Sequence, residues 1–70
     1  MNKSRDTQYH KLVKKLISTE RTELLKSVFE PLKPVEIANI LLQLKLQHQL
    51  VVLENLEREI SSEVLNNLQD

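Results

Sequence analysis

Residues 28–44 read VFEPLKPVEIANILLQL, and the apolar residues of this stretch return at intervals of twelve along the rest of the chain. The three series are Val28, Ile40, Val52 and Val64; Phe29, Leu41, Leu53 and Leu65; and Leu32, Leu44, Leu56 and Leu68. Twelve residues of continuous α-helix overshoot three turns by about 120°, so one unbroken helix would spread these side chains around its circumference. A break in each repeat lets every short helix turn the same face to a shared core. We therefore expect an all-α fold, a right-handed superhelical stack of about five short helices.

Two prolines mark the first break between helices. Pro31 and Pro34 bracket it, and Pro34 suits the first residue of the next helix because its missing N–H is not needed there. The apolar stripes predict helices over residues 6–18, 21–30, 34–44, 48–56 and 60–69. Asp6 is the expected N-cap of the first. The chain thus reads as a disordered N-terminus at residues 1–5 and a single short-helix domain at residues 6–70, part of a longer domain.

The predicted core combines the repeat residues with the apolar faces of the helix expected at residues 21–30 and of the Pro34 helix. Its expected members are Leu24, Leu25, Val28, Phe29, Leu32, Ile37, Ile40, Leu41, Leu44, Val52, Leu53, Leu56, Val64, Leu65 and Leu68. Upstream, a further apolar stripe runs through the helix expected at residues 6–18.

Composition supports a helical, cytoplasmic module. The chain has no Gly and no Cys, and its only aromatic residues are Tyr9 and Phe29, whereas a sheet would use more β-branched and aromatic residues. No apolar run approaches the roughly 20 residues that span a membrane. Net charge is zero but uneven: residues 1–35 carry eight Lys and Arg against four acids, and residues 36–70 carry two against six.

The sequence offers no catalytic motif. His10 and His48 are the only histidines, and with no Cys they form no zinc-ligand spacing. Each is expected to be a surface or helix-end residue. The lack of Gly excludes a Walker loop and a dinucleotide fingerprint. We expect a non-enzymatic protein with no tightly bound cofactor.

A basic group lies in the first helix. Lys11 and Lys15 are one turn apart, with Lys14 and Tyr9 nearby, an arrangement open to interpretation as a nucleic-acid or lipid-facing patch. We favour a solvated helix face instead, because the domain as a whole is not basic. No nucleic-acid partner is expected.

The acidic residues of the second half are the candidate metal ligands. Glu54, Glu57, Glu59 and Glu63 cluster in sequence, and such carboxylates suit weak binding of Mg²⁺. Their ordinary interpretation, as solvated surface, is favoured. Glu36 is weighed in the same way: at the third position of the Pro34 helix its carboxylate reaches free backbone N–H groups, which is favoured over ion binding.

Residues 32–44, LKPVEIANILLQL, are similar to the signature L-x-P-x-[DE]-I-A-x-x-L-x-x-L of the N-terminal domain of MgtE magnesium transporters. Residues 16–25 resemble the helix, polar turn and helix that lead into this motif, and residues 50–56 and 63–68 resemble the helices after it. The turns at residues 45–47 and 57–59 depart from the family pattern, because they lack its prolines. The flagellar switch protein FliG has related short-helix repeats.

The resemblance implies a cytosolic regulatory module that precedes a pair of CBS domains and a membrane channel. In that family Mg²⁺ bridges carboxylates of the N-domain and the CBS domains of the same polypeptide, and the compacted assembly closes the pore. Differential ion binding to one state shifts such an equilibrium. On this interpretation the chain is a fragment, and it reaches a membrane only through the remainder of the transporter. The alternative is a free-standing helical protein-interaction module, FliG-like or self-associating, with a homodimer as one form.

Overall fold

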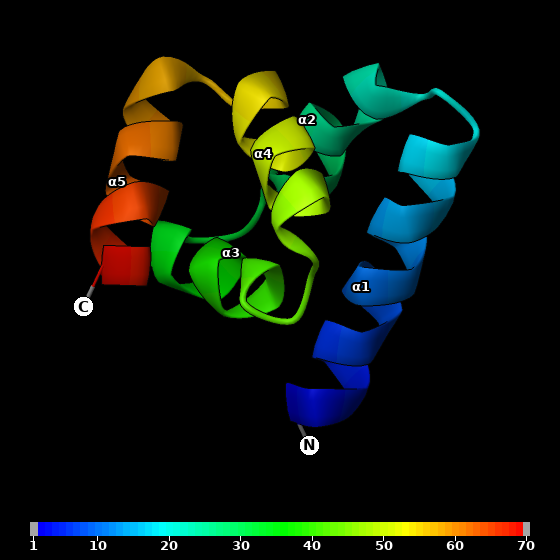
Figure 1. Ribbon diagram of the computed structural model, residues 1–70. Coiled ribbons are helices and arrows are strands. Elements are labelled where there is room, and N and C mark those ends of the chain that lie inside the picture. Colours follow the sequence, from blue (N-terminus) through cyan, green and yellow to red (C-terminus); the bar gives the residue numbers. More distant parts are fainter. Residues whose placement is uncertain (1, 70) are drawn as a thin grey trace.

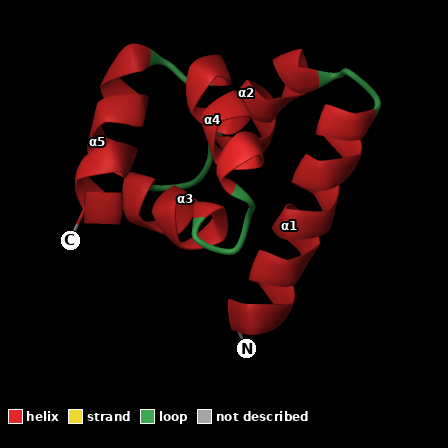
Figure 2. Cartoon of the chain, in the orientation of Figure 1, coloured by secondary structure: helices red, strands yellow, loops and turns green. Residues whose placement is uncertain are grey.

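The chain folds into five α-helices and one short 3₁₀ helix in the computed structural model, which describes residues 2–69 and the side chains of residues 8–68 (Figure 1). The elements are α1 (Asn2–Ser18), η1 (Thr22–Leu24), α2 (Leu25–Phe29), α3 (Pro34–Leu41), α4 (Leu46–Asn55) and α5 (Arg58–Gln69). Residues 2–69 contain no strand (Figure 2), so the predicted all-α fold is confirmed. The right-handed superhelical winding stays a prediction.

Helices distant in sequence pack together. α1 and α5 lie on opposite sides of the molecule, with α3 and α4 between them (Figure 1). The most extensive contact joins α3 to α5, while α1 packs on α3 and α4, and α4 packs on α2 and η1. α3 is therefore the helix around which the core is assembled.

α3 ends earlier than predicted because the chain tightens after it. The Gln43 N–H donates to the Ile40 carbonyl at 3.1 Å and the Leu44 N–H donates to the Leu41 carbonyl at 2.9 Å. These bonds span three residues rather than four, so they close a turn instead of extending the α-helix. The turn still delivers Leu44 to the core, where it is 5% exposed.

The N-terminal helix differs from the prediction at its start. α1 begins at Asn2, so Asp6 lies within it and is not its N-cap. Lys3 and Arg5 are good helix formers and no Pro or Gly interrupts the stretch, so nothing local stops the helix. The helix predicted at residues 21–30 is divided into η1 and α2.

Among the side chains of residues 8–68, twelve apolar ones form one buried core. They are Val13, Leu16, Leu25, Phe29, Leu32, Ile37, Ala38, Ile40, Leu41, Leu44, Val52 and Val64. Nine of them are on the predicted list. Four further predicted residues, Val28, Leu53, Leu56 and Leu68, are partly buried against this cluster. Leu24 and Leu65 were expected in the core but are 40% and 43% exposed, which corrects the prediction.

Positions twelve residues apart tend to be buried together. This holds also for a fourth series of positions, here called a column, that is not part of the sequence motif. Val13, Leu25 and Ile37 are twelve residues apart and each is 0% exposed. The next two places in this column hold Gln49 and Ser61, which are polar. Gln49 Nε2 donates to the Leu44 carbonyl at 3.0 Å and Ser61 Oγ donates to the Leu53 carbonyl at 2.7 Å. The same position is thus apolar early in the chain, and later it carries side chains that hydrogen-bond the backbone of the preceding segment.

Candidate interaction surfaces

Glu36, the acidic residue of the resemblance motif, is committed to its own helix. Lys33 is the N-cap of α3, and its backbone N–H donates to Glu36 Oε1 at 2.9 Å. The carboxylate also lies in the first turn, where negative charge favours the helix dipole. The structural role preferred from the sequence is therefore confirmed: Glu36 caps the start of α3.

The remaining candidate metal ligands do not form a three-carboxylate site. Glu54, Glu57, Glu59 and Glu63 are all exposed, and Glu57 Oε1 lies 3.3 Å from Lys26 Nζ in an ion pair. Among the described residues, no three His, Cys, Asp or Glu side chains lie close enough to hold a metal ion. Glu59 and Glu63 are one turn apart on α5.

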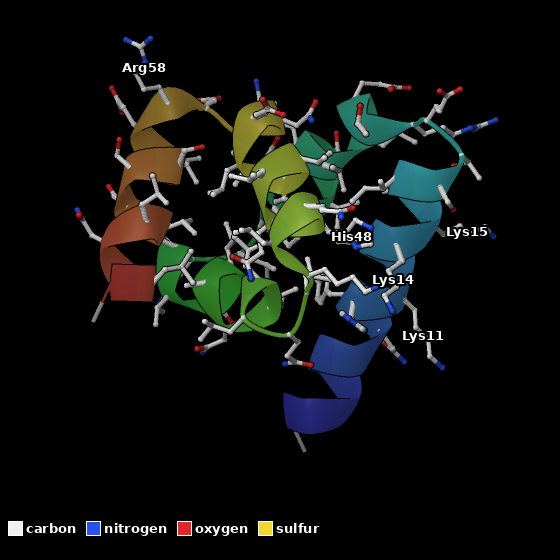
Figure 3. The ribbon with its side chains drawn as sticks, in the orientation of Figure 1. Lys11, Lys14, Lys15, His48 and Arg58 are labelled. Atoms are coloured by element: carbon white, nitrogen blue, oxygen red, sulfur yellow. The ribbon has the colours of Figure 1, made fainter. Side chains whose placement is uncertain are left out.

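The basic group of α1 divides into a structural and a solvated part. The Tyr9 ring stacks on Phe29, with centroids 6.2 Å apart and planes 19° apart, so it packs on the core rather than on a ligand. Lys11, Lys14 and Lys15 are exposed, and Lys11 and Lys15 extend away from the body of the molecule (Figure 3).

The two histidines are both half-buried. His48 lies in the first turn of α4, as expected for a helix-end residue, and its side chain lies in the space between α4 and α1 (Figure 3). Its Nδ1 atom is buried without a hydrogen-bond partner within the described part of the protein. His10 belongs to α1.

A shallow groove lies where α2 meets the corner between α4 and α5. It is lined by Lys26, Phe29, Glu30, Leu56, Glu57 and Ile60. The Lys26–Glu57 ion pair is at its edge, with side chains 54% and 60% exposed, so it contributes at most about 1 kcal/mol. This contact fastens α2 to the start of α5 and brings no reactive group into the groove.

Three leucines are the most exposed large apolar residues among the side chains that the structure describes. Leu46 and Leu50 are one turn apart on α4 and are 68% and 53% exposed, and we call them the outer leucine pair. Leu42, in the turn before α4, is 63% exposed. Each leaves a large apolar side chain in water, which the fold itself does not require.

Hydrogen bonds at both ends of α4 determine which face of this helix is outward. Gln49 Nε2 anchors its first half to the Leu44 carbonyl, and Ser61 Oγ binds the Leu53 carbonyl near its end. Val52 is its only residue with full burial in the core. The inner face of α4 is thus fixed to the domain by these hydrogen bonds and by Val52, and the outer leucine pair lies on the exposed side of the helix.

The sequence analysis did not single out the outer leucine pair or Leu42, although a signal for them exists. All three fall outside the three apolar series of the twelve-residue repeat, whereas Ile40, Val52 and Val64 fall within one of them. Among the described leucines, those that are buried in the core all lie in register with the repeat, and of the exposed ones only Leu65 does.

No helix within residues 2–69 has both the length and the apolarity to cross a membrane. Comparison of the chain with models of protein families, with curated proteins and with solved structures finds no match.

Proposed function

We propose that this chain is a small helical protein-interaction module that binds an apolar helix or groove of a partner through the outer leucine pair. The observation that carries the proposal is the exposure of Leu46 and Leu50 on a helix that is otherwise anchored to the domain. Exposed apolar patches on small soluble domains mark interaction sites. Gln43 and Gln47 are uncharged and Lys45 is an exposed cation, so the surface beside the leucine pair is polar with a single positive charge at the N-cap of α4.

Photo-crosslinking in the cells that express the protein tests this proposal. A photoreactive phenylalanine derivative at Gln47, which is exposed on α4 between the two leucines, should give a discrete crosslinked species. The same group at Asn67, exposed on α5, is the matched control and should give none. Leu46→Ser with Leu50→Ser should abolish the species. Equal crosslinking from both positions, or none from either, contradicts the proposal, and a species of twice the chain mass identifies a second copy as the partner.

A second candidate function is regulation of a magnesium transporter through contact with CBS domains. Two observations favour it: the residues of the L-x-P-x-E-I-A pattern supply the central helix α3, and Glu59 and Glu63 present an exposed carboxylate pair on α5. Mg²⁺ binds through one or two carboxylates and keeps several waters, so such a pair suffices if a partner supplies the other ligands.

Two measurements test the magnesium function. Immunoblots of separated membrane and soluble fractions should show a membrane band several times larger than this chain, whereas a soluble band of the mass of this chain contradicts it. In NMR spectra, millimolar Mg²⁺ should shift the amide signals around Glu59 and Glu63 more than equal ionic strength of Na⁺ does. Glu59→Gln with Glu63→Gln should remove the difference.

A further inference from the structure

A second surface lies between the end of α1 and η1, away from the outer leucine pair. A hollow there is lined by Leu12, Lys15, Leu16, Thr19, Arg21 and Leu24. Leu16 is 8% exposed and forms its inner wall, while Leu12 and Leu24 are each 40% exposed. Lys15 extends outward from α1 beside it (Figure 3). The hollow therefore combines an apolar interior with two exposed cations.

The backbone that shapes the hollow is fixed by hydrogen bonds. The Arg21 N–H donates to the Leu16 carbonyl at 2.8 Å and the Glu20 N–H donates to the Ile17 carbonyl at 3.2 Å. Glu20 has φ 59°, and this pairing is a Schellman motif in which Glu20 takes the left-handed position. The motif reverses the chain and places Leu24 opposite α1, so the hollow is formed by backbone geometry as well as side-chain packing.

The polar backbone groups at the hollow are already satisfied. Thr19 Oγ1 donates to the Lys15 carbonyl at 2.8 Å, and Ser18 Oγ donates to the same carbonyl at 3.1 Å. In contrast, the Lys15 and Arg21 side chains are in no ion pair within the part of the chain that the structure describes. A ligand there meets apolar surface and free positive charge, and it has few backbone groups left to bind.

The charges around the hollow favour an anionic ligand. Two cations, Lys15 and Arg21, line the hollow, and its lining contains no Asp or Glu. Over an apolar floor these two positive charges are less screened than on open surface. The hollow has no aromatic side chain on which a nucleic-acid base stacks, which argues against single-stranded nucleic acid.

We infer that the hollow between α1 and η1 binds an acidic amphipathic helix of a partner protein, with one apolar side chain over Leu16 and carboxylates on Lys15 and Arg21. This mode places i and i+3 or i+4 anchors in an apolar groove. It rests on the proposed function in that the chain is an interaction module, but it uses a different surface. Arg21 suits the role because its guanidinium binds a carboxylate through two parallel hydrogen bonds.

Fluorescence anisotropy with a defined peptide tests the inference on the full chain. The probe is a labelled, end-capped helical peptide of about 15 residues, long enough to be partly helical, with leucines three and four residues apart and glutamates between them. The same peptide with lysine for every glutamate is the charge control, and alanine for every leucine is the apolar control. We expect saturable binding of the acidic leucine peptide alone, weakened severalfold as NaCl rises from about 50 to 500 mM.

Variants of the chain locate the binding site. Lys15→Glu with Arg21→Glu should weaken binding about tenfold or more, and Leu12→Ser with Leu24→Ser should do the same, as expected for central anchors of an interface. Lys33→Glu and Leu65→Ser are matched controls on exposed residues elsewhere, and should leave affinity unchanged. Circular dichroism of each variant verifies its fold.

Three outcomes overturn the inference: no saturable binding of the acidic peptide, equal binding of the lysine peptide, or binding that the Lys15 and Arg21 substitutions leave unchanged. These outcomes are separable from failure of the proposed function. Crosslinking from Gln47 reports on the outer leucine pair of α4, and none of the hollow variants alters that helix.

Discussion

α3 and α4 are neighbours in sequence and similarly rich in apolar residues, yet they use them differently. α3 buries Ile37, Ala38, Ile40 and Leu41 in eight residues, whereas α4 buries only Val52 in ten. The twelve-residue register explains part of the difference, because Ile37, Ile40 and Leu41 lie in its series and Leu46 does not. Leu50, however, lies twelve residues after the buried Ala38 and is nevertheless 53% exposed. Hydrophobicity alone therefore does not separate the core of this protein from its candidate binding surface.

The N-terminal residues of α3 and α4 also differ, in how well they cap their helices. Lys33 and Lys45 are both extended N-cap residues, with ψ 154° and 152°, and they are twelve residues apart. α3 continues with Pro34 and Glu36, which supply a fixed φ and a capping carboxylate. The equivalent positions of α4 hold Leu46 and His48, which supply neither. α3 is therefore stabilised by its cap and by the burial of its apolar face, whereas α4 depends on the hydrogen bonds near its two ends.

The largest expected effect comes from truncating the core face of α3. Ile37→Ala should lower the free energy of unfolding by about 3 kcal/mol, because it removes a fully buried side chain and leaves a cavity. Val35→Ala, on the exposed side of the same helix, should change it by less than about 0.5 kcal/mol. Urea denaturation followed by circular dichroism measures both, and similar losses from the two variants would contradict the assigned burial.

Removal of the α3 cap should have the next largest effect. Glu36→Ala leaves the Lys33 N–H without its acceptor and should cost about 1 kcal/mol. Glu54→Ala, an exposed carboxylate in the last turn of α4, is the control and should be nearly neutral. Equal destabilisation by both would mean that general charge, rather than the cap, stabilises the fold.

A proline at the first position of α4, as α3 has at Pro34, tests whether the two helix starts are interchangeable. No hydrogen bond donated by the Leu46 N–H is present among the described residues, and Lys45 already has the extended backbone that precedes proline. Leu46→Pro should therefore raise the free energy of unfolding by about 0.5 kcal/mol through reduced entropy of the unfolded chain. A loss of stability in the same denaturation assay would show that the N–H of Leu46 or its side chain has a structural role.

The smallest expected change concerns the end of α1. Glu20 has φ 59°, where a side chain with a Cβ is disfavoured and glycine is not. Glu20→Gly should raise the free energy of unfolding by at most about 0.5 kcal/mol, because the relief of backbone strain is partly offset by the greater entropy of glycine in the unfolded chain. Thermal denaturation should show this as a slightly higher midpoint. Glu23→Gly, within η1, is the matched control and should destabilise. A gain from both would assign the effect to loss of negative charge.

Much of the fold follows from the periodicity, and the exceptions have local causes. The repeat identifies Ile40, Val52 and Val64 because burial at a fixed interval needs only a consistent turn between helices. It places Leu65 wrongly, because no helix among the described residues covers that face of α5 and the side chain is 43% exposed. The early start of α1 was missed because the residues before Tyr9 have helical propensity but no apolar stripe.

The candidate surfaces were less predictable than the core. Glu36 was correctly placed as a cap because its reach depends only on local sequence. The exposure of Leu46, and the hollow beside Leu24, depend on which helices pack together, and α3 packs mainly on α5 rather than on its sequence neighbours. Contacts between distant segments are not encoded in any single stretch, so the free surfaces emerge only from the assembled structure.

The most direct test of the difference between α3 and α4 is the unfolding free energy of the Leu46→Ser, Leu50→Ser double variant. If these leucines contribute nothing to the core and are available to a partner, the free energy of unfolding of the double variant in urea should lie within about 0.5 kcal/mol of that of the unsubstituted protein. A loss of about 2 kcal/mol or more would show that they belong to the core, and α4 would then have no free apolar face to offer.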